Sequence, residues 1–254
     1  MTAEKPSGEH AGIRINRYLG MAGVASRRKA EELVLEGRVS INGTPVTDLA
    51  TRIDPHRDRV TVDGKHVHEV QTMVYLVMNK PKDAITTVSD EKGRRTVMSL
   101  LQSHHRVFPV GRLDRNTTGV LLFTNDGELA NRLMHPKFKI AKVYYVTTDK
   151  PVTRVHVELL RSGVKLDDRA TAPAEVYVLP EGKHTKHAVG LVEGRNRQVR
   201  RMFETLGYEV VKLDRVAYGP VTKHGLARGE SRSLTRKEVR ALRTLAGMEV
   251  EYAN

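Results

Sequence analysis

The stretch from Val107 to Asp126 constrains the fold of this chain more than any other part of the sequence. An apolar approach leads into a short polar segment, and Gly119–Phe123 then has the continuous apolar pattern of a fully buried strand. Asp114 therefore leaves the core on a short loop between two apolar segments. Gly111 and Gly119 on either side of it allow close backbone approach or unusual φ angles. A carboxylate held in this way suits a rigid active-site group, and it equally suits a turn aspartate that caps its own loop.

The residues around this aspartate also form a recognisable pattern. Gly-Arg-Leu-Asp at 111–114, followed by x-x-Thr-x-Gly, resembles the catalytic signature of the pseudouridine synthases that modify ribosomal RNA. It is most similar to the branch with an N-terminal RNA-binding domain, which includes small-subunit synthases of type A and large-subunit synthases of type B. The resemblance implies that Asp114 is the catalytic residue.

Three further segments match the same family in the same order along the chain. Lys142-x-Tyr144 resembles the motif whose tyrosine stacks on the target base, and Leu213-x-Arg215 resembles the motif that places a leucine against the uracil. The segment 193–207 resembles the motif that supplies a basic partner for the catalytic aspartate. The resemblance implies catalytic roles for Tyr144 and Arg200 beside Asp114, and substrate contacts for Arg112, Arg197, Arg201 and Leu213. Taken one at a time, Tyr144 and Leu213 could equally be core residues, and the arginines could equally lie on a solvated helix face. The occurrence of all these motifs in the family's order favours the family.

Residues 13–70 form a separate compact pattern. A short helix over 13–22 is followed by a second helix that begins after Ser26 and ends before Gly37. Asn42-Gly43 and Asp63-Gly64 are typical of tight hairpin turns. The segment 14–43 resembles the alpha-L RNA-binding domain, which implies phosphate contacts by Arg14, Arg17, Arg27, Arg28, Lys29 and Arg38. A row of cations at a helix start also suits an anion, although a charge run is more often a solvated face.

The order of expected helices and strands along the chain predicts an α+β fold. With the resemblances above, we expect a small N-terminal alpha-L RNA-binding domain followed by a mostly antiparallel mixed-sheet catalytic domain. We divide the chain into a disordered tail (1–12), the RNA-binding domain (13–70) and a pseudouridine synthase domain (71–254), with the linker at 69–73. Strands are expected at 74–78, 142–148, 174–179, 187–192 and 208–216. Helices are expected at 95–101, 128–134, 153–161, within 193–207 and from the cap signals at 233–235 to about 245.

Composition and charge limit the classes of partner and cofactor that we expect for this chain. Lys and Arg number 43 against 30 Asp and Glu, which gives a net charge of +13 and argues for a polyanion. The excess is strongest over 193–243, with 13 basic and 6 acidic residues. The chain has no cysteine, which fits a reducing cytoplasm, and the histidines lack ligand spacing, so we expect no metal and no cofactor. No apolar run is long enough for a membrane helix and no signal peptide is apparent.

The function we expect is the isomerisation of uridine to pseudouridine in ribosomal RNA, by a monomer that flips the target base. The segment 126–136 resembles the large-subunit enzymes of the family more than the small-subunit ones, which implies a large-subunit substrate. Two alternatives of other classes remain, a non-catalytic RNA-binding or ribosome-assembly protein and a metal-dependent nuclease. The chain departs from the family at Ala141, where glutamate is common, and at 228–232, where a tryptophan-containing turn is common.

Overall fold

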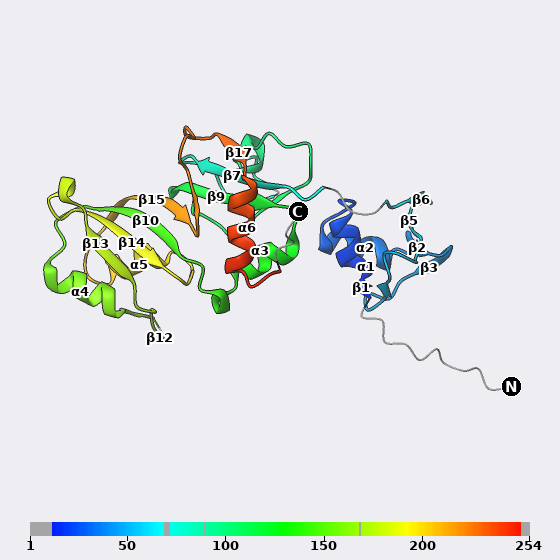
Figure 1. Ribbon diagram of the computed structural model, residues 1–254, viewed down its shortest axis with the longest axis horizontal. Helices are drawn as coiled ribbons and strands as arrows, with labels where there is room; N and C mark the ends of the chain where they lie inside the picture. The colour runs from blue at the N-terminus through cyan, green and yellow to red at the C-terminus, as the bar shows by residue number, and fades with distance from the viewer. Residues whose placement is uncertain (1–11, 69–71, 89, 168, 250–254) are drawn as a thin grey trace. The chain divides into compact units, whose positions relative to one another are not determined.

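The computed structural model describes residues 12–68, 72–88, 90–167 and 169–249. The chain divides into two compact units between Met73 and Val74, close to the boundary expected after residue 70. The expected tail lies outside the described residues except for Gly12, and so does most of the expected linker. Each unit is described by itself (Figure 1).

The N-terminal unit contains two helices and a small sheet, as the sequence predicts. Helix α1 spans Ile15–Met21 and α2 spans Arg27–Leu35, with the Ser26 hydroxyl accepting a 3.2 Å hydrogen bond from the Lys29 amide as the N-cap. Strands β2 (Val39–Ile41), β3 (Thr44–Val46), β5 (Val60–Val62) and β6 (Lys65–His66) form a sheet of order β3-β2-β5-β6, and β1 (Ile13–Arg14) pairs with β4 (Arg52–Ile53). The asparagine and glycine at 42–43 have positive φ angles, so the expected hairpin turn is confirmed.

The C-terminal unit is built on one mixed sheet of order β13-β14-β10-β15-β9-β7-β17, with β8 and β16 beside it (Figure 1). All of its neighbouring strands are antiparallel except β9 and β15, which are parallel. The bounds are β7 Tyr75–Lys80, β8 Phe108–Pro109, β9 Thr118–Thr124, β10 Lys142–Thr148, β13 Glu175–Val178, β14 Lys186–Leu191, β15 Val210–Tyr218, β16 Val221–Thr222 and β17 Ser231–Ser233. The expected α+β class with a mostly antiparallel mixed sheet is confirmed.

Helices cover this sheet in two groups. Helices α3 (Gly127–Met134) and α6 (Arg236–Leu245) share one core, and α4 (Arg154–Ser162) and α5 (Gln198–Glu204) share another. Strand β9 is buried on both faces, because its alternate residues enter the α3–α6 core and a third core on the opposite side. This double burial explains why the strand reads as one continuous apolar run. Its central position fixes the loop that precedes it.

Two glycines make the connection into β9 possible. Gly111 has a φ of +75° and Gly119 a φ of +106°, both costly for residues with a side chain. A Cβ atom on Gly119 would lie 2.1 Å from the backbone oxygen of Arg215 on the parallel neighbour. The sequence-based expectation of close backbone approach here is confirmed.

Two expected helices are shorter in the structure. Only a 3-10 turn at Met98–Leu100 forms within 95–101, because Thr96 forms a bridge with Ile85 and the flanking backbone is committed to hydrogen bonds with that residue. Helix α5 begins at Gln198, because Arg197 has a left-handed backbone. The short pairs β11 (Lys165–Leu166) with β12 (Arg169–Ala170), and the edge strand β17, were not foreseen. None of the helices in the described part of the chain has the length and apolar character that crossing a membrane requires.

Candidate active site

The loop that carries Asp114 is fixed at both ends by strands. Strand β8 precedes the loop, β9 follows it, and the two strands pair with each other. Just after β8, the Val110 amide donates to the Leu122 carbonyl at 2.8 Å. Within the loop the Thr117 amide donates to the Asp114 carbonyl at 3.0 Å. The hydroxyl of Thr86 donates to the backbone oxygen of the preceding leucine at 2.8 Å. The Asp114 carboxylate is thus presented from a closed turn with a defined backbone.

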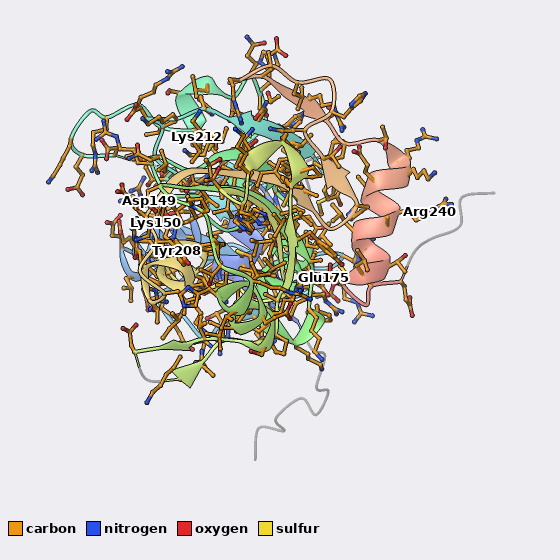
Figure 2. The ribbon with its side chains drawn as sticks, turned by 90° about the vertical axis from the view of Figure 1, so that its left-hand side faces the viewer. Asp149, Lys150, Glu175, Tyr208, Lys212 and Arg240 are labelled. Atoms are coloured by element: carbon orange, nitrogen blue, oxygen red, sulfur yellow. The ribbon has the colours of Figure 1, made fainter. Side chains whose placement is uncertain are left out.

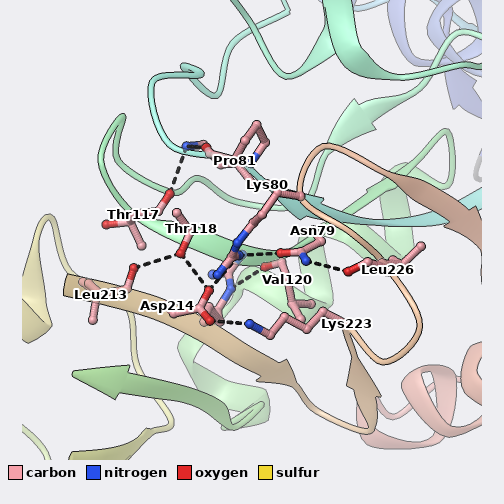
Figure 3. A network of polar contacts seen from close by, with 12 residues as sticks. Asn79, Lys80, Pro81, Thr117, Thr118, Val120, Leu213, Asp214, Lys223 and Leu226 are labelled. Atoms are coloured by element: carbon pink, nitrogen blue, oxygen red, sulfur yellow. Dashed lines mark hydrogen bonds and ion pairs between the residues drawn. The ribbon is translucent and has the colours of Figure 1, made fainter. Parts of the chain in front are cut away.

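A buried lysine anchors the same loop from below. The ammonium of Lys80, at the end of β7, lies 2.9–3.2 Å from the carbonyl oxygens of four residues, Pro81, Asp114, Arg115 and Thr117. Figure 3 includes Lys80 with Pro81 and Thr117. Lys80 is fully buried. Burial lowers the pKa of Lys80 to about 8, although the carboxylates of Asp114 and Asp83 act in the opposite direction. The three N–H donors of one ammonium therefore tie together the whole backbone turn under Asp114.

Asp114 opens onto a cleft of about 890 Å³ in the C-terminal unit. Five of the seven residues implied as catalytic or substrate-binding by the sequence line this cleft, namely Arg112, Asp114, Tyr144, Arg197 and Leu213. Six cationic side chains line it against two carboxylates: Arg112, Arg115, Lys142, Arg195, Arg197 and Arg215 against Asp114 and Glu193. The cleft therefore carries the charge expected for a polyanionic substrate.

Tyr144 and Leu213 reach the cleft from adjacent strands. In the β10–β15 pair Tyr144 lies opposite Arg215, and Leu213 lies opposite Val146. Tyr144 is half-buried and Leu213 is 6% exposed. An aromatic and an aliphatic side chain in one cleft provide two apolar surfaces between which a flat ring can bind.

Arg200 lies beside the cleft rather than in its lining. Its Nη1 donates to the Val210 carbonyl at 2.5 Å, and no ion pair with Asp114 forms among the described residues. Burial, together with Arg197, lowers the pKa of Arg200, while the nearby Asp114 carboxylate acts to raise it. Asp114 thus acts electrostatically on Arg200 without direct contact. The pairing of these two residues remains a prediction.

Arg197 is the N-cap residue of α5 and Arg201 lies in its last turn, and their side chains make different contacts. The guanidinium of Arg201 pairs with Asp167 at 2.5 Å and bonds to the Asn196 carbonyl, and it does not line the cleft. Arg197 lines the cleft, is exposed, and lies 3.3 Å from Glu204. Of the two, Arg197 has the better placement for substrate contact.

A second polar network lies behind the loop and was not foreseen. The Asp214 carboxylate accepts hydrogen bonds from Thr118 (2.7 Å) and Arg228 (2.9 Å) and pairs with Lys223 (Figure 3). Burial alone would raise the pKa of Asp214, but these donors outweigh burial and hold it below its usual value. The network joins β15 to β9 and to the segment 223–228, so the atypical turn at 228–232 contributes to the support of the site.

The six implied RNA contacts of the N-terminal unit are all exposed, but their pairing differs. Lys29 lies 2.6 Å from Glu32, and Arg38 pairs with both Asp63 and Glu36. Arg14, Arg27 and Arg28 form no ion pair with any described residue. These three cations are therefore the ones most readily available to phosphates.

Comparison with known proteins gives the same assignment. The model of the RNA pseudouridylate synthase family matches residues 74–205, and that of the S4 domain matches residues 13–58. The chain is 43% identical over 237 residues to the ribosomal large subunit pseudouridine synthase B of Bacillus subtilis, covering 92% of this chain and 96% of that protein. It is 41% identical to an RNA pseudouridine synthase of Aquifex aeolicus, over 93% of this chain and 96% of the relative.

A solved structure agrees with these sequence matches. A crystal structure of a pseudouridylate synthase superposes with a TM-score of 0.67 at 28% identity, covering 91% of this chain and 99% of the other. The family resemblance that began at Asp114 is confirmed over nearly the whole chain. The chain therefore belongs to the RNA pseudouridylate synthase family, with an S4 domain ahead of the synthase domain.

Proposed function

We propose that this protein isomerises a specific uridine to pseudouridine in large-subunit ribosomal RNA. The observation that carries the proposal is Asp114, held over the buried ammonium of Lys80 in one cleft with Tyr144 and Leu213. Relatives from Bacillus subtilis and Pseudomonas aeruginosa, 43% and 38% identical, are named large subunit synthases B, which supports the large-subunit substrate. The excess of cations in the cleft suits RNA.

The reaction needs few groups from the protein. It breaks the N1–C1′ bond of uridine, turns the base, and joins C5 to C1′. Glycosidases generally use two carboxylates because their leaving group must be protonated. Uracil leaves as a resonance-stabilised anion, so one carboxylate suffices. The cleft is consistent with a single reacting carboxylate. Its second carboxylate, Glu193, accepts hydrogen bonds from the Gln198 side chain at 2.5 Å and from the Ala172 amide at 3.1 Å.

Asp114 is the reacting group in this account. It attacks or stabilises C1′, or attacks C6 of the base, and Arg200 attracts and orients its carboxylate from beside the cleft. The target base leaves its stack at a cost of a few kcal/mol. Tyr144 and Leu213 then hold the base between them, and the exposed Arg112 fills the space that it vacates. The S4 domain supplies further phosphate contacts, and the protein acts as a monomer in the cytoplasm.

The proposal is tested with ribosomal RNA labelled with tritium at C5 of uridine. Forming the C5–C1′ bond expels the C5 hydrogen, so pseudouridine formation releases tritium to water. We expect release from large-subunit RNA and none from small-subunit RNA, at one position mapped by carbodiimide primer extension. Release from small-subunit RNA alone would reassign the substrate. No release from either RNA, with binding intact, would favour a non-catalytic RNA-binding protein.

A further inference from the structure

The cleft contains two buried cations that have no counter-ion among the described residues. Lys142 is 8% exposed and Arg215 is 3% exposed, and both line the cleft. Arg215 donates from Nε to the Val120 carbonyl at 2.7 Å, and its Nη2 is buried without a hydrogen-bond partner. Neither cation forms an ion pair with any residue that the structure describes. Buried charges in proteins are normally paired, so this arrangement calls for an anion from outside the chain.

The aromatic ring that both cations approach cannot supply that charge. The Lys142 ammonium lies 5.3 Å from the centre of the Tyr218 ring, and the guanidinium carbon of Arg215 lies 5.2 Å from it. The phenol donates to the Leu133 carbonyl at 2.8 Å, and burial raises the pKa of Tyr218 to about 12. Tyr218 is therefore neutral at physiological pH and offers only the face of its ring.

Neither carboxylate of the cleft forms an ion pair with these two cations. Glu193 is bound by Gln198 and lies 3.5 Å from Arg195, and Asp114 makes no ion pair with Lys142 or Arg215. The two cations also destabilise each other, because burial, reinforced by the charge of Arg215, lowers the pKa of Lys142 to about 8. The fold thus keeps two repelling charges in a low-dielectric site, which is typical of functional sites.

We propose that Lys142 and Arg215 form an anion site that stabilises the negative charge which the uracil ring acquires during isomerisation. This inference rests on the proposed function. When the N1–C1′ bond breaks, its electron pair stays on the base and spreads over O2 and O4. After C5 bonds to C1′, the base loses the C5 proton and N1 gains one, so the conversion is balanced. If Asp114 attacks C6 instead, the displaced electrons reach C5 and O4, and the same site serves.

The position of Lys142 favours the base over a backbone phosphate. Lys142 and Tyr144 are two residues apart on β10 and so project from the same face of the strand, and Arg215 lies opposite Tyr144. The cations are therefore next to the ring on which the base stacks. Backbone phosphates remain outside when a base flips, and the exposed Arg112 and Arg197 suit them better.

The test compares Lys142→Met and Lys142→Arg under single-turnover conditions at saturating RNA. We expect Lys142→Met to slow pseudouridine formation by about 100-fold or more, as the loss of one charge-stabilising donor does in other enzymes. RNA affinity should stay within about twofold, Lys142→Arg should recover most of the rate, and the melting temperature of Lys142→Met should rise because a buried charge is gone.

Lys150→Met is a matched control. The Lys150 ammonium also lies over a tyrosine ring, 5.5 Å from the centre of Tyr208, but it is exposed and outside the cleft (Figure 2). This variant should react at the wild-type rate. A slow Lys150→Met would show that the assay responds to any lysine–tyrosine pair and would overturn the inference.

The pH profile supplies a readout that a merely structural lysine would not move. In the part of the chain that the structure describes, the titratable and charged side chains that face Lys142 are Arg215 and Tyr218 on β15. The rate should fall above about pH 8 in the wild type, and this limb should move to higher pH in Lys142→Arg.

Three results would overturn the inference while the wild type remains active. They are an unchanged rate in Lys142→Met, a loss confined to RNA affinity with a shallower salt dependence, and a destabilised Lys142→Met that arginine does not rescue. The second result would identify a phosphate site instead. A wild type inactive on ribosomal RNA would overturn the proposed function as well.

Discussion

Two lysines in the synthase domain are buried to a similar degree, yet their surroundings differ completely. Lys80 is fully buried and Lys142 is 8% exposed, and burial lowers the pKa of each to about 8. The Lys80 ammonium has four carbonyl oxygens within 3.2 Å, whereas Lys142 faces a tyrosine ring and a second cation. The difference indicates that Lys80 stabilises the structure of the site, whereas Lys142 is available to interact with the substrate.

Replacing Lys80 should have the largest effect on stability. Lys80→Met leaves the carbonyls of Pro81 and Thr117 without their donor, whereas those of Asp114 and Arg115 keep a backbone amide. Each unsatisfied buried acceptor costs about 1–3 kcal/mol. We expect the free energy of unfolding to fall by at least about 2 kcal/mol and pseudouridine formation to be lost. Urea denaturation measures the first and tritium release the second. Equal stability of Lys80→Met and Lys142→Met would break the comparison.

The Asp214 network gives a smaller expected effect. Asp214→Asn keeps the shape of the side chain but leaves Lys223 and Arg228 without a carboxylate. We expect the free energy of unfolding to fall by about 1–3 kcal/mol, because the pair is partly buried and one partner is removed. Asp149→Asn, which alters an exposed aspartate whose carboxylate accepts from the backbone amide of Glu209, is the control (Figure 2). Matching denaturation curves for the two variants would show that the network adds no stability.

The pH dependence of stability sharpens the comparison further. The folded pKa of Lys142 is about 8, below its ordinary value of 10.5, so between these limits the unfolded chain binds the extra proton. Stability then rises with pH, and the burial cost of the ammonium is fully present only below about pH 8. Lys142→Met should be more stable than the wild type at pH 7, and this advantage should shrink towards pH 10. An advantage that is independent of pH would contradict the assigned pKa shift.

The smallest expected effect concerns the S4 domain, where paired and unpaired cations again differ. Replacing Arg27 and Arg28 together by glutamine should flatten the logarithmic salt dependence of RNA binding by up to about 0.9 for each phosphate that the variant no longer neutralises. Replacing Lys29, which is paired with Glu32, should change it less. Filter binding over a salt series measures both slopes. A larger change in the slope on replacing Lys29 would mean that Lys29, rather than Arg27 and Arg28, contacts the phosphates.

Local signals in the sequence were enough to predict much of the fold. Ser26 and Thr235 cap the helices that follow them, and the alternating and apolar runs at 142–148 and 119–123 are strands. The loop position of Asp114 followed from the same patterns. What could not be predicted depends on contacts between distant segments: Lys80 meets carbonyls 34 to 37 positions further on, which no local pattern encodes.

The details of the site show the same limit. Arg200 and Arg201 are neighbours on one short helix, and sequence could not separate them; the structure directs one towards Val210 and the other towards Asp167. The proximity of Lys142 and Arg215 depends on the register between β10 and β15, which sets Lys142 opposite Tyr218 and Arg215 opposite Tyr144. The available signal in the sequence was a cation within each of two segments expected to be strands.

Asp114→Asn tests the central claim most directly. The substitution is nearly isosteric, and the Lys80 anchor contacts only the backbone of this residue, so the fold and RNA binding should remain intact. Tritium release from large-subunit RNA in a single turnover should be abolished, because the amide lacks the charge that must react with the substrate. A variant within tenfold of the wild-type rate would mean a barrier change below about 1.4 kcal/mol, which is too small for the reacting carboxylate, and would contradict the account.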